Sequence, residues 1–290
     1  MNKYLISADI EGITGVINKN FSKEGGKYYQ LGCRYMLSDV NAVIQGIVKA
    51  DPEAEIIVRD AHGVSAVNLD LERLHGRAKL IQGWGAVQNM LTGLDQEYKG
   101  VFLVGFHAGG QNIAAVLGHT MHSIINAIRV NGRLVNETGL MALYAGFYNV
   151  PVVFISGDNW AVSEARDQLG DIVSVAVKES YGRDCGVSFS LEKSRALLEK
   201  GAMDAVLKLQ QKQFLPFKIP GPFNMEIKFY DTGVRVSVMQ NLSEILEFDK
   251  NYKFNRQEHT MIFSADNVLT MLQRLNMLLF LVYGIQSSSL

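Results

Sequence analysis

Cysteine and proline are scarce in this chain, which has two cysteines and five prolines among 290 residues. Cys33 and Cys185 are too few for a disulfide framework or a cysteine-rich zinc site, so we expect two free, mostly buried thiols in a reducing compartment. No internal repeat and no low-complexity segment is present. Hydrophobic residues make up 48% and charged residues 20%, which is the composition of a folded globular protein rather than a disordered, collagen-like or coiled-coil one.

An excess of either charge is also lacking, because 28 Lys and Arg residues face 29 Asp and Glu residues, a net charge of −1. Without a broad cationic surface, neither nucleic acid nor an anionic membrane is an expected partner. The N-terminus reaches Asp9 too early to contain the apolar region of a secretion signal. The most apolar run, residues 277–283, is far shorter than the roughly 20 residues that cross a bilayer. We therefore predict a cytoplasmic protein, with this run on the buried face of a C-terminal helix.

Short β-rich runs alternate with longer helical patterns over the first two-thirds of the chain. This alternation predicts an α/β fold with a mostly parallel sheet flanked by helices. The predicted strands are residues 4–8, 55–59, 101–106, 124–130, 152–155 and 225–239, and the predicted helices are residues 28–50, 138–147, 159–170, 191–211 and 265–283. We expect residues 1–160 to form the α/β domain and residues 161–290 to form a C-terminal α+β subdomain.

Acidic residues and histidines, the residue types that bind metal ions, follow three of the predicted strands. Asp9 and Glu11 come after the first strand, and their i, i+2 spacing places them on one face of an extended segment. Asp60 and His62 follow the second strand with the same spacing, and His107 follows the buried strand at 101–106. The carboxyl ends of the strands line the ligand crevice of an open parallel sheet, so these side chains are expected at one cleft.

Each of these pieces also has an ordinary structural explanation. An acidic residue after a strand is often a helix cap or part of a solvated turn, and a single histidine there is often a hydrogen-bonded core residue. Their recurrence at successive strand ends favours a metal site, because burying several carboxylates together is costly without a cation.

Further candidates lie between residues 118 and 140. His119 and His122 come close after His107, and Glu137 follows Asn136. Glu137 also fits the first turn of a helix, where an acid is favoured by the dipole and Asn136 would be the N-cap. His122 is expected on the surface. The glycine pair at 109–110 lacks the rest of a phosphate-binding fingerprint, so we do not predict nucleotide binding.

Taken in order, five motifs resemble the zinc-dependent D-aminopeptidases of the DppA type, peptidase family M55. They are Asp9-x-Glu11-Gly12, Asp60-x-His62, Gly105-x-His107-Ala108, His119-Thr-Met and Glu137-x-Gly139-Leu140. The resemblance covers residues 1–180 in order and spacing, and the C-terminal third offers no motif to match.

The resemblance implies a site with two zinc ions and a catalytic histidine. By position, Asp9 would bridge the ions, with Glu11 and His62 completing one and His107 and Glu137 completing the other. His119 would be the catalytic residue, which the family describes as a nucleophile. A proton-transfer role is the version we favour, because a two-metal site already supplies a nucleophile. Asp60 is assigned to the second shell, orienting an imidazole or a water, although a ligand role is also open.

The residue chemistry agrees with two metal ions. Carboxylate oxygens and imidazole nitrogens suit zinc, and a carboxylate has two oxygens with which to span a pair of ions. Two zinc ions would bring about +4, and the carboxylates of Asp9, Glu11 and Glu137 about −3. Three departures from the family pattern bear on substrate choice: Gly118 before His119, the extra His122, and the uncharged segment 109–117.

The resemblance implies short peptides with N-terminal D-residues, such as D-Ala-D-Ala, as substrates and a ring-stacked homo-oligomer, a decamer in the best-known case. Two alternatives stay open at this point. One is a two-metal amidase or phosphoesterase acting on another substrate, because the same chemistry serves several bonds. The other is a protein that binds peptides without turnover. The preference for D- or L-residues and the length of peptide accepted are not fixed by the residues.

Overall fold

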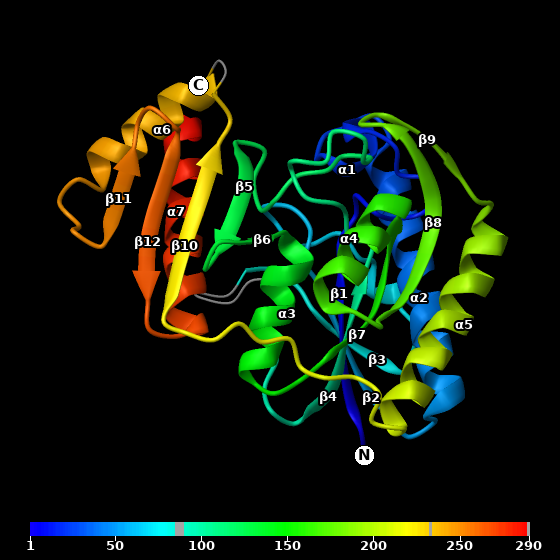
Figure 1. Ribbon diagram of the computed structural model, residues 1–290. Helices are drawn as coiled ribbons and strands as arrows, with labels where there is room; N and C mark the ends of the chain where they lie inside the picture. The colour runs from blue at the N-terminus through cyan, green and yellow to red at the C-terminus, as the bar shows by residue number, and fades with distance from the viewer. Residues whose placement is uncertain (85–89, 232–233, 289–290) are drawn as a thin grey trace. The chain divides into compact units, whose positions relative to one another are not determined.

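The computed structural model describes residues 1–84, 90–231 and 234–288, which fall into two compact units (Figure 1). Unit 1 comprises Met1–Ala108, Asn112–Gly118 and Thr138–Lys218. Unit 2 comprises Gly109–Gln111, His119–Glu137 and Ile219–Leu290. Unit 2 therefore takes two short stretches from between the three parts of unit 1, and the rest from the C-terminal quarter of the chain.

Unit 1 is built on a seven-stranded sheet with the order β3-β2-β1-β4-β7-β8-β9. Its strands are β1 (Lys3–Ala8), β2 (Glu55–Asp60), β3 (Ala78–Ile81), β4 (Tyr98–Val104), β7 (Val152–Asp158), β8 (Val173–Gly182) and β9 (Cys185–Ser188). All neighbours are parallel except β8 and β9, which confirms the predicted α/β class. Because β1 lies between β2 and β4, the carboxyl ends of these three strands meet at one edge.

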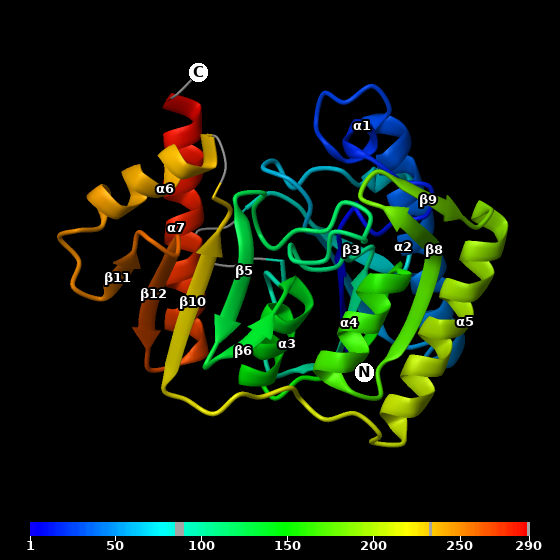
Figure 2. The same cartoon turned by 45° about the horizontal axis from the view of Figure 1, so that its top comes forward.

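Helices cover the sheet of unit 1. They are α1 (Lys19–Ser22), α2 (Tyr29–Ala50), the 3₁₀ turn η1 (Leu71–Arg73), α3 (Glu137–Phe147, all but its first residue in this unit), α4 (Asn159–Leu169) and α5 (Leu191–Gln210). Helices α2 and α5 pack against each other along their length, as both views show (Figure 1, Figure 2). Tyr4 and Ile6 of β1 join the core beneath these helices, whereas Leu5 is buried outside that core. Strand β1 is thus buried on both faces, as a central parallel strand requires.

Unit 2 is built on a five-stranded antiparallel sheet with the order β11-β12-β10-β5-β6. Its strands are β5 (Ile125–Val130), β6 (Arg133–Val135), β10 (Phe223–Phe229), β11 (Tyr252–Asn255) and β12 (Thr260–Ala265). Two helices, α6 (Val234–Ile245) and α7 (Val268–Ser288), pack on it, and α7 runs along β10 and β12 (Figure 2).

One helix in the described part of the chain, α7, is long and apolar enough to cross a bilayer when judged by length and composition alone. The stretch Val268–Gln286 has a mean hydropathy of 1.6, and 39% of it is buried. The run 277–283 was predicted to form a buried face, but only part of it does. Leu278 and Val282 are buried, whereas Phe280 is 64% exposed. A run without polar residues covers every side of a helix, so only the sides that pack against other elements, such as α6, β10 and β12, can be buried.

Two other predictions differ from the structure. Residues 225–239 were predicted to be one strand, but β10 ends at Phe229 and α6 begins at Val234. Alternation in this region overlaps a helical pattern, since the residues that α6 buries, Val238, Met239 and Leu242, recur at helical spacing. The strand at 124–130 exists, but as β5 it belongs to the antiparallel sheet rather than to the parallel one.

The division of the chain also differs from the predicted boundary at residue 160. Strands β8 and β9 extend the sheet that contains β1, and α5 packs on it, so residues up to 218 belong to unit 1. Strand β8 was not predicted from the sequence. The predicted boundary at residue 160 therefore lies about 60 residues before the actual one, at residue 218.

Candidate functional site

Asp9 and Glu11 occupy the turn that directly follows β1. The Asp9 amide donates to the Val104 carbonyl of β4 (2.8 Å), and the Gly12 amide donates to the Gly105 carbonyl (2.7 Å). A Cβ on Gly12 would lie 2.0 Å from the Phe106 carbonyl oxygen, so only glycine allows this close approach. The chain therefore turns tightly against the end of β4 and buries both acidic side chains.

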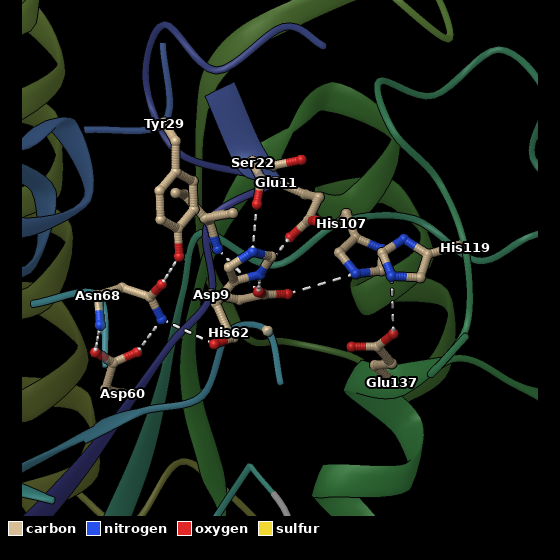
Figure 3. Close-up of polar contacts among 12 residues, drawn as sticks. Asp9, Glu11, Ser22, Tyr29, Asp60, His62, Asn68, His107, His119 and Glu137 are labelled. Atoms are coloured by element: carbon tan, nitrogen blue, oxygen red, sulfur yellow. Dashed lines mark hydrogen bonds and ion pairs between the residues drawn. The ribbon is translucent and has the colours of Figure 1, made fainter. Parts of the chain in front are cut away.

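His62, two residues beyond β2, lies against both acids. Its Nδ1 is 2.9 Å from Asp9 Oδ1 and 3.1 Å from Glu11 Oε2, and its Nε2 is 2.6 Å from the Ser22 carbonyl oxygen (Figure 3). Ligand atoms of these three residues all lie within 4.8 Å of one another. The i, i+2 spacing of Asp9 and Glu11 therefore directs both carboxylates to the same atom, His62 Nδ1, as the sequence predicts.

His107, three residues beyond β4, faces the other oxygen of Asp9. Its Nε2 is 3.4 Å from Asp9 Oδ2, and its Nδ1 is 3.0 Å from the Ala108 carbonyl oxygen. A carbonyl only accepts, so Nδ1 carries the proton when this hydrogen bond forms, and the lone pair of Nε2 is then directed at Asp9. The carboxylate of Asp9 thus has an imidazole at each oxygen (Figure 3).

The electrostatics of this cluster are those of a cation site. Burial, together with the Glu11 carboxylate, raises the pKa of Asp9 to about 7. Burial by itself lowers the pKa of His62, but the carboxylates of Glu11 and Asp9 outweigh it and hold this pKa well above its usual value. The protein alone can therefore balance its acids only by keeping protons among them. Oxygen and nitrogen ligands in this arrangement fit a divalent cation such as zinc, which would displace those protons.

Asp60 holds the backbone that carries His62 and does not contact the imidazole ring itself. Its Oδ2 accepts from the amides of Asn68 (2.5 Å) and Leu69 (2.8 Å), and its Oδ1 accepts from Asn68 Nδ2 (2.7 Å). Asn68 Nδ2 also donates to the His62 carbonyl (2.8 Å), and the Tyr29 hydroxyl donates to Asn68 Oδ1 (Figure 3). The supporting role predicted for Asp60 is thus exerted through Asn68 on the loop.

His119 and Glu137 lie in unit 2 and contact each other. His119 Nε2 is 3.9 Å from Glu137 Oε1, and the same oxygen accepts from the Met121 amide (2.6 Å). The Glu137 side chain is buried and that of His119 is 24% exposed. Glu137 begins α3, as the helix-start interpretation of the sequence expected. Its carboxylate, however, is also directed to the His119 segment.

His122 was predicted to be a surface residue, and the structure contradicts this. Its side chain is buried, its ring packs edge-on against Tyr283 of α7 with centroids 5.0 Å apart, and its Nδ1 accepts from the Ile124 amide (3.3 Å). No local pattern in the sequence marks this burial, because the ring that covers His122 belongs to a helix about 160 residues later in the chain. The structure thus gives His122 a packing role in unit 2.

Three residues that support the cluster were missed by sequence reasoning: Asp39, Asn68 and Lys178. Asp39 is fully buried in α2, and burial raises its pKa to about 6 although Thr14 donates to it through both its amide and its hydroxyl. Lys178 is fully buried on β8, and burial lowers its pKa to about 8. Asp39 and Lys178 are distant in sequence from the residues they support, and Asn68 lies six residues beyond His62 on a loop without a recognisable motif.

The free cysteines have different surroundings. Cys33 is buried in α2 and Cys185 is exposed at the start of β9, and neither forms a disulfide. Both thiols are free, as predicted, but the prediction that they are mostly buried holds for Cys33 and is wrong for Cys185.

Known proteins resemble this chain over most of its length. The family model described as D-aminopeptidase, peptidase family M55, matches residues 2–268. The D-aminopeptidase of Bacillus subtilis (strain 168) is 33% identical over 215 residues, which span 74% of this chain and 77% of that protein. A solved structure, the Zn-dependent D-aminopeptidase DppA from Bacillus subtilis, described as a self-compartmentalizing protease, matches with a TM-score of 0.89 and 27% identity. This match covers 97% of this chain and 98% of the other. The resemblance that five short motifs indicated is therefore confirmed, and the chain belongs to the D-aminopeptidase family of peptidases, M55.

Proposed function

We propose that this enzyme removes the N-terminal residue from short peptides that begin with a D-amino acid, using two zinc ions. Membership of the D-aminopeptidase family supports the reaction, and the zinc-dependent relative supports the metal. The observation that carries the proposal is Asp9, whose two oxygens face His62 and His107 at 2.9 and 3.4 Å. A carboxylate held between two imidazoles in this way is suited to bridge a pair of ions.

The proposed ligand set keeps the assignment made from the resemblance. In this assignment Asp9 would be shared by both ions, Glu11 and His62 would hold one ion, and His107 and Glu137 would hold the other. The buried carboxylates supply about −3 against about +4 from two zinc ions, so the loaded site would be close to neutral. When bound, zinc in such a site polarises the scissile carbonyl and activates water at neutral pH.

Two histidines of the chain, His119 and His107, are placed to transfer or to hold a proton. Glu137 Oε1 lies 3.9 Å from His119 Nε2. A protonated imidazole at this position could deliver a proton to the amine that leaves when the peptide bond breaks. His107 keeps its Nδ1 proton on the Ala108 carbonyl, which leaves Nε2 available as a ligand. We favour this proton-transfer role of His119 over direct attack.

Assembly and location are part of the proposal. The self-compartmentalizing relative supports a homo-oligomer, and family resemblance suggests a decamer. The exposed thiol of Cys185 supports a reducing compartment, and we propose the cytoplasm. Neither nucleic acid nor a membrane is proposed as a partner.

Metal analysis combined with hydrolysis assays tests the proposal. Purified protein should contain two zinc ions per chain and should release alanine from D-Ala-D-Ala, and a chelator should abolish this release until zinc is restored. L-Ala-L-Ala is the matched control and should be cleaved far more slowly. A protein that binds peptides but cleaves neither would contradict the proposal, and so would hydrolysis of a phosphate ester in place of both.

A further inference from the structure

The turn after β1 continues as an irregular segment, residues 10–16, before the chain reaches α1. Backbone bonds to β4 anchor its start, and the Thr14 amide and hydroxyl donate to Asp39 Oδ2, each at 2.9 Å. The Gly15 amide donates to the Ser188 hydroxyl of β9 (3.2 Å). The amides of Gly12, Thr14 and Gly15 thus have partners outside the segment, at the end of β4, on α2 and on β9.

The carbonyl groups of the same segment converge on one side chain, Lys178. Its Nζ donates to the carbonyl oxygens of Glu11 (2.5 Å), Ile13 (3.0 Å) and Val16 (2.5 Å). An ammonium has three donors and no acceptor, so these contacts use all of them. Lys178 is fully buried, and its proton donors are already engaged with backbone. It is therefore not placed to donate a proton to a substrate.

A cation at this position is supported by the acids that surround it. The carboxylates of Asp39, Asp158 and Glu11 are the charged groups that act on it, and all three are buried in unit 1. A buried charge is costly unless it is paired and hydrogen-bonded, and here three hydrogen bonds and the field of three carboxylates offset that cost. A neutral apolar side chain of the same length would remove the Lys178 donor from all three buried carbonyls, and of the three the Ile13 carbonyl also accepts from the Val16 amide (3.2 Å).

We propose that Lys178 is a positioning residue of the peptidase, which fixes the Glu11 carboxylate for metal binding by holding the carbonyl groups of residues 11, 13 and 16. The Glu11 backbone is bonded to Lys178 while its side chain lies 3.1 Å from His62 Nδ1. Movement of the carbonyl by an ångström would move the carboxylate as well. The inference rests on the proposed function in one respect, that Glu11 is a zinc ligand.

The first test compares Lys178→Met with the wild type and with Lys49→Met. Lys49→Met is the matched control, because Lys49 is an exposed lysine of α2 that pairs with Glu199. Amide hydrogen exchange of residues 10–16 should be at least tenfold faster in Lys178→Met and unchanged in Lys49→Met. Affinity for one of the two zinc ions, measured by competition with a chromogenic chelator, should fall at least tenfold. Unchanged exchange and unchanged zinc affinity in a folded Lys178→Met protein would overturn the proposal.

A double-mutant cycle tests whether the effect passes through Glu11. Glu11→Gln should lower the affinity for the same zinc ion. Adding Lys178→Met to Glu11→Gln should lower that affinity by less than a further twofold. An equally large further loss in the Glu11→Gln background would overturn the positioning role, because Lys178 would then act on the site by another route.

Two further measurements keep the proposal testable. If Lys178→Met does not fold, Lys178→Gln retains one donor group and should show intermediate exchange of residues 10–16; wild-type exchange in Lys178→Gln would overturn the proposal. If the wild type binds no zinc and cleaves no peptide, the proposed function fails. In that case the exchange experiment, which needs neither metal nor turnover, still decides whether Lys178 holds the segment.

Discussion

The acids and imidazoles of unit 1 are held differently from the pair in unit 2. Asp9, His62 and His107 follow the ends of three adjacent parallel strands. Hydrogen bonds between these strands fix the position of the backbone from which each side chain extends. His119 and Glu137 belong to a segment outside any strand end of the parallel sheet. What joins them there is one oxygen of Glu137, which contacts both the His119 ring and the Met121 amide.

The difference corresponds to different demands on the side chains. A ligand set must hold several like charges at fixed distances, which a sheet with anchored ends can do. A residue that carries a proton needs access to solvent or substrate. The His107 side chain is 1% exposed, whereas that of His119 is 24% exposed. Backbone near His119 also departs from the common regions, since Met121 has a φ of 62°. We therefore expect substitutions in unit 1 to remove metal and substitution of His119 to remove turnover alone.

Asp9→Ala should have the largest effect, because both of its oxygens face imidazoles. We expect zinc content to fall below one ion per chain and kcat/KM to fall by at least about 10³-fold, which elemental analysis and peptide hydrolysis will measure. Glu55→Ala, an exposed acid on β2, is the matched control and should change neither. Retention of two ions in Asp9→Ala would show that Asp9 does not bridge.

His119→Ala should separate chemistry from metal binding. The proposed proton transfer predicts a loss of about 10²–10⁴-fold in kcat with two zinc ions retained. Glu137→Ala is the informative partner variant, and it should lose one ion as well as activity. If His119→Ala loses an ion, the histidine is a ligand, and the contrast between the two regions disappears.

Asp39 provides a pH-dependent prediction for the anchoring of the unit 1 segment. Its pKa is about 6 in the folded protein and about 3.9 in an unfolded chain, so the folded state binds more protons between these values. Stability contributed by protonated Asp39 is therefore present below pH 4 and is lost as pH rises through 6. Relative to Asp39→Asn, the wild type should lose about 2 kcal/mol of unfolding free energy between pH 4 and pH 7.

Urea unfolding of both proteins at several pH values measures this difference. Asn at position 39 can still accept from Thr14, so the comparison isolates the charge. A stability difference that does not vary with pH would mean that Asp39 is ionised throughout this range.

The strand-end residues could be predicted from sequence because local rules place them. Alternation puts Asp9 and Glu11 on one face, and parallel strands bring their carboxyl ends to one edge. The residues that hold those side chains in place obey no local rule. Lys178 acts on a segment more than 160 residues earlier in the chain, and the contact exists only because β8 was added to the sheet. The same holds for His122, whose burial depends on α7.

Asn68 gives the smallest of the expected effects and tests how far support extends behind the metal site. Asn68→Ala removes the donor that joins Asp60 to the His62 carbonyl, while Asp60 keeps its bond to the Leu69 amide. Loss of such a supporting contact typically weakens metal binding by about 10–100-fold. Tyr29→Phe removes only the outermost bond, to Asn68 Oδ1, and should change zinc affinity less than Asn68→Ala does. Equal zinc affinities in the wild type and Asn68→Ala, measured by chelator competition, would show that strand ends alone position His62.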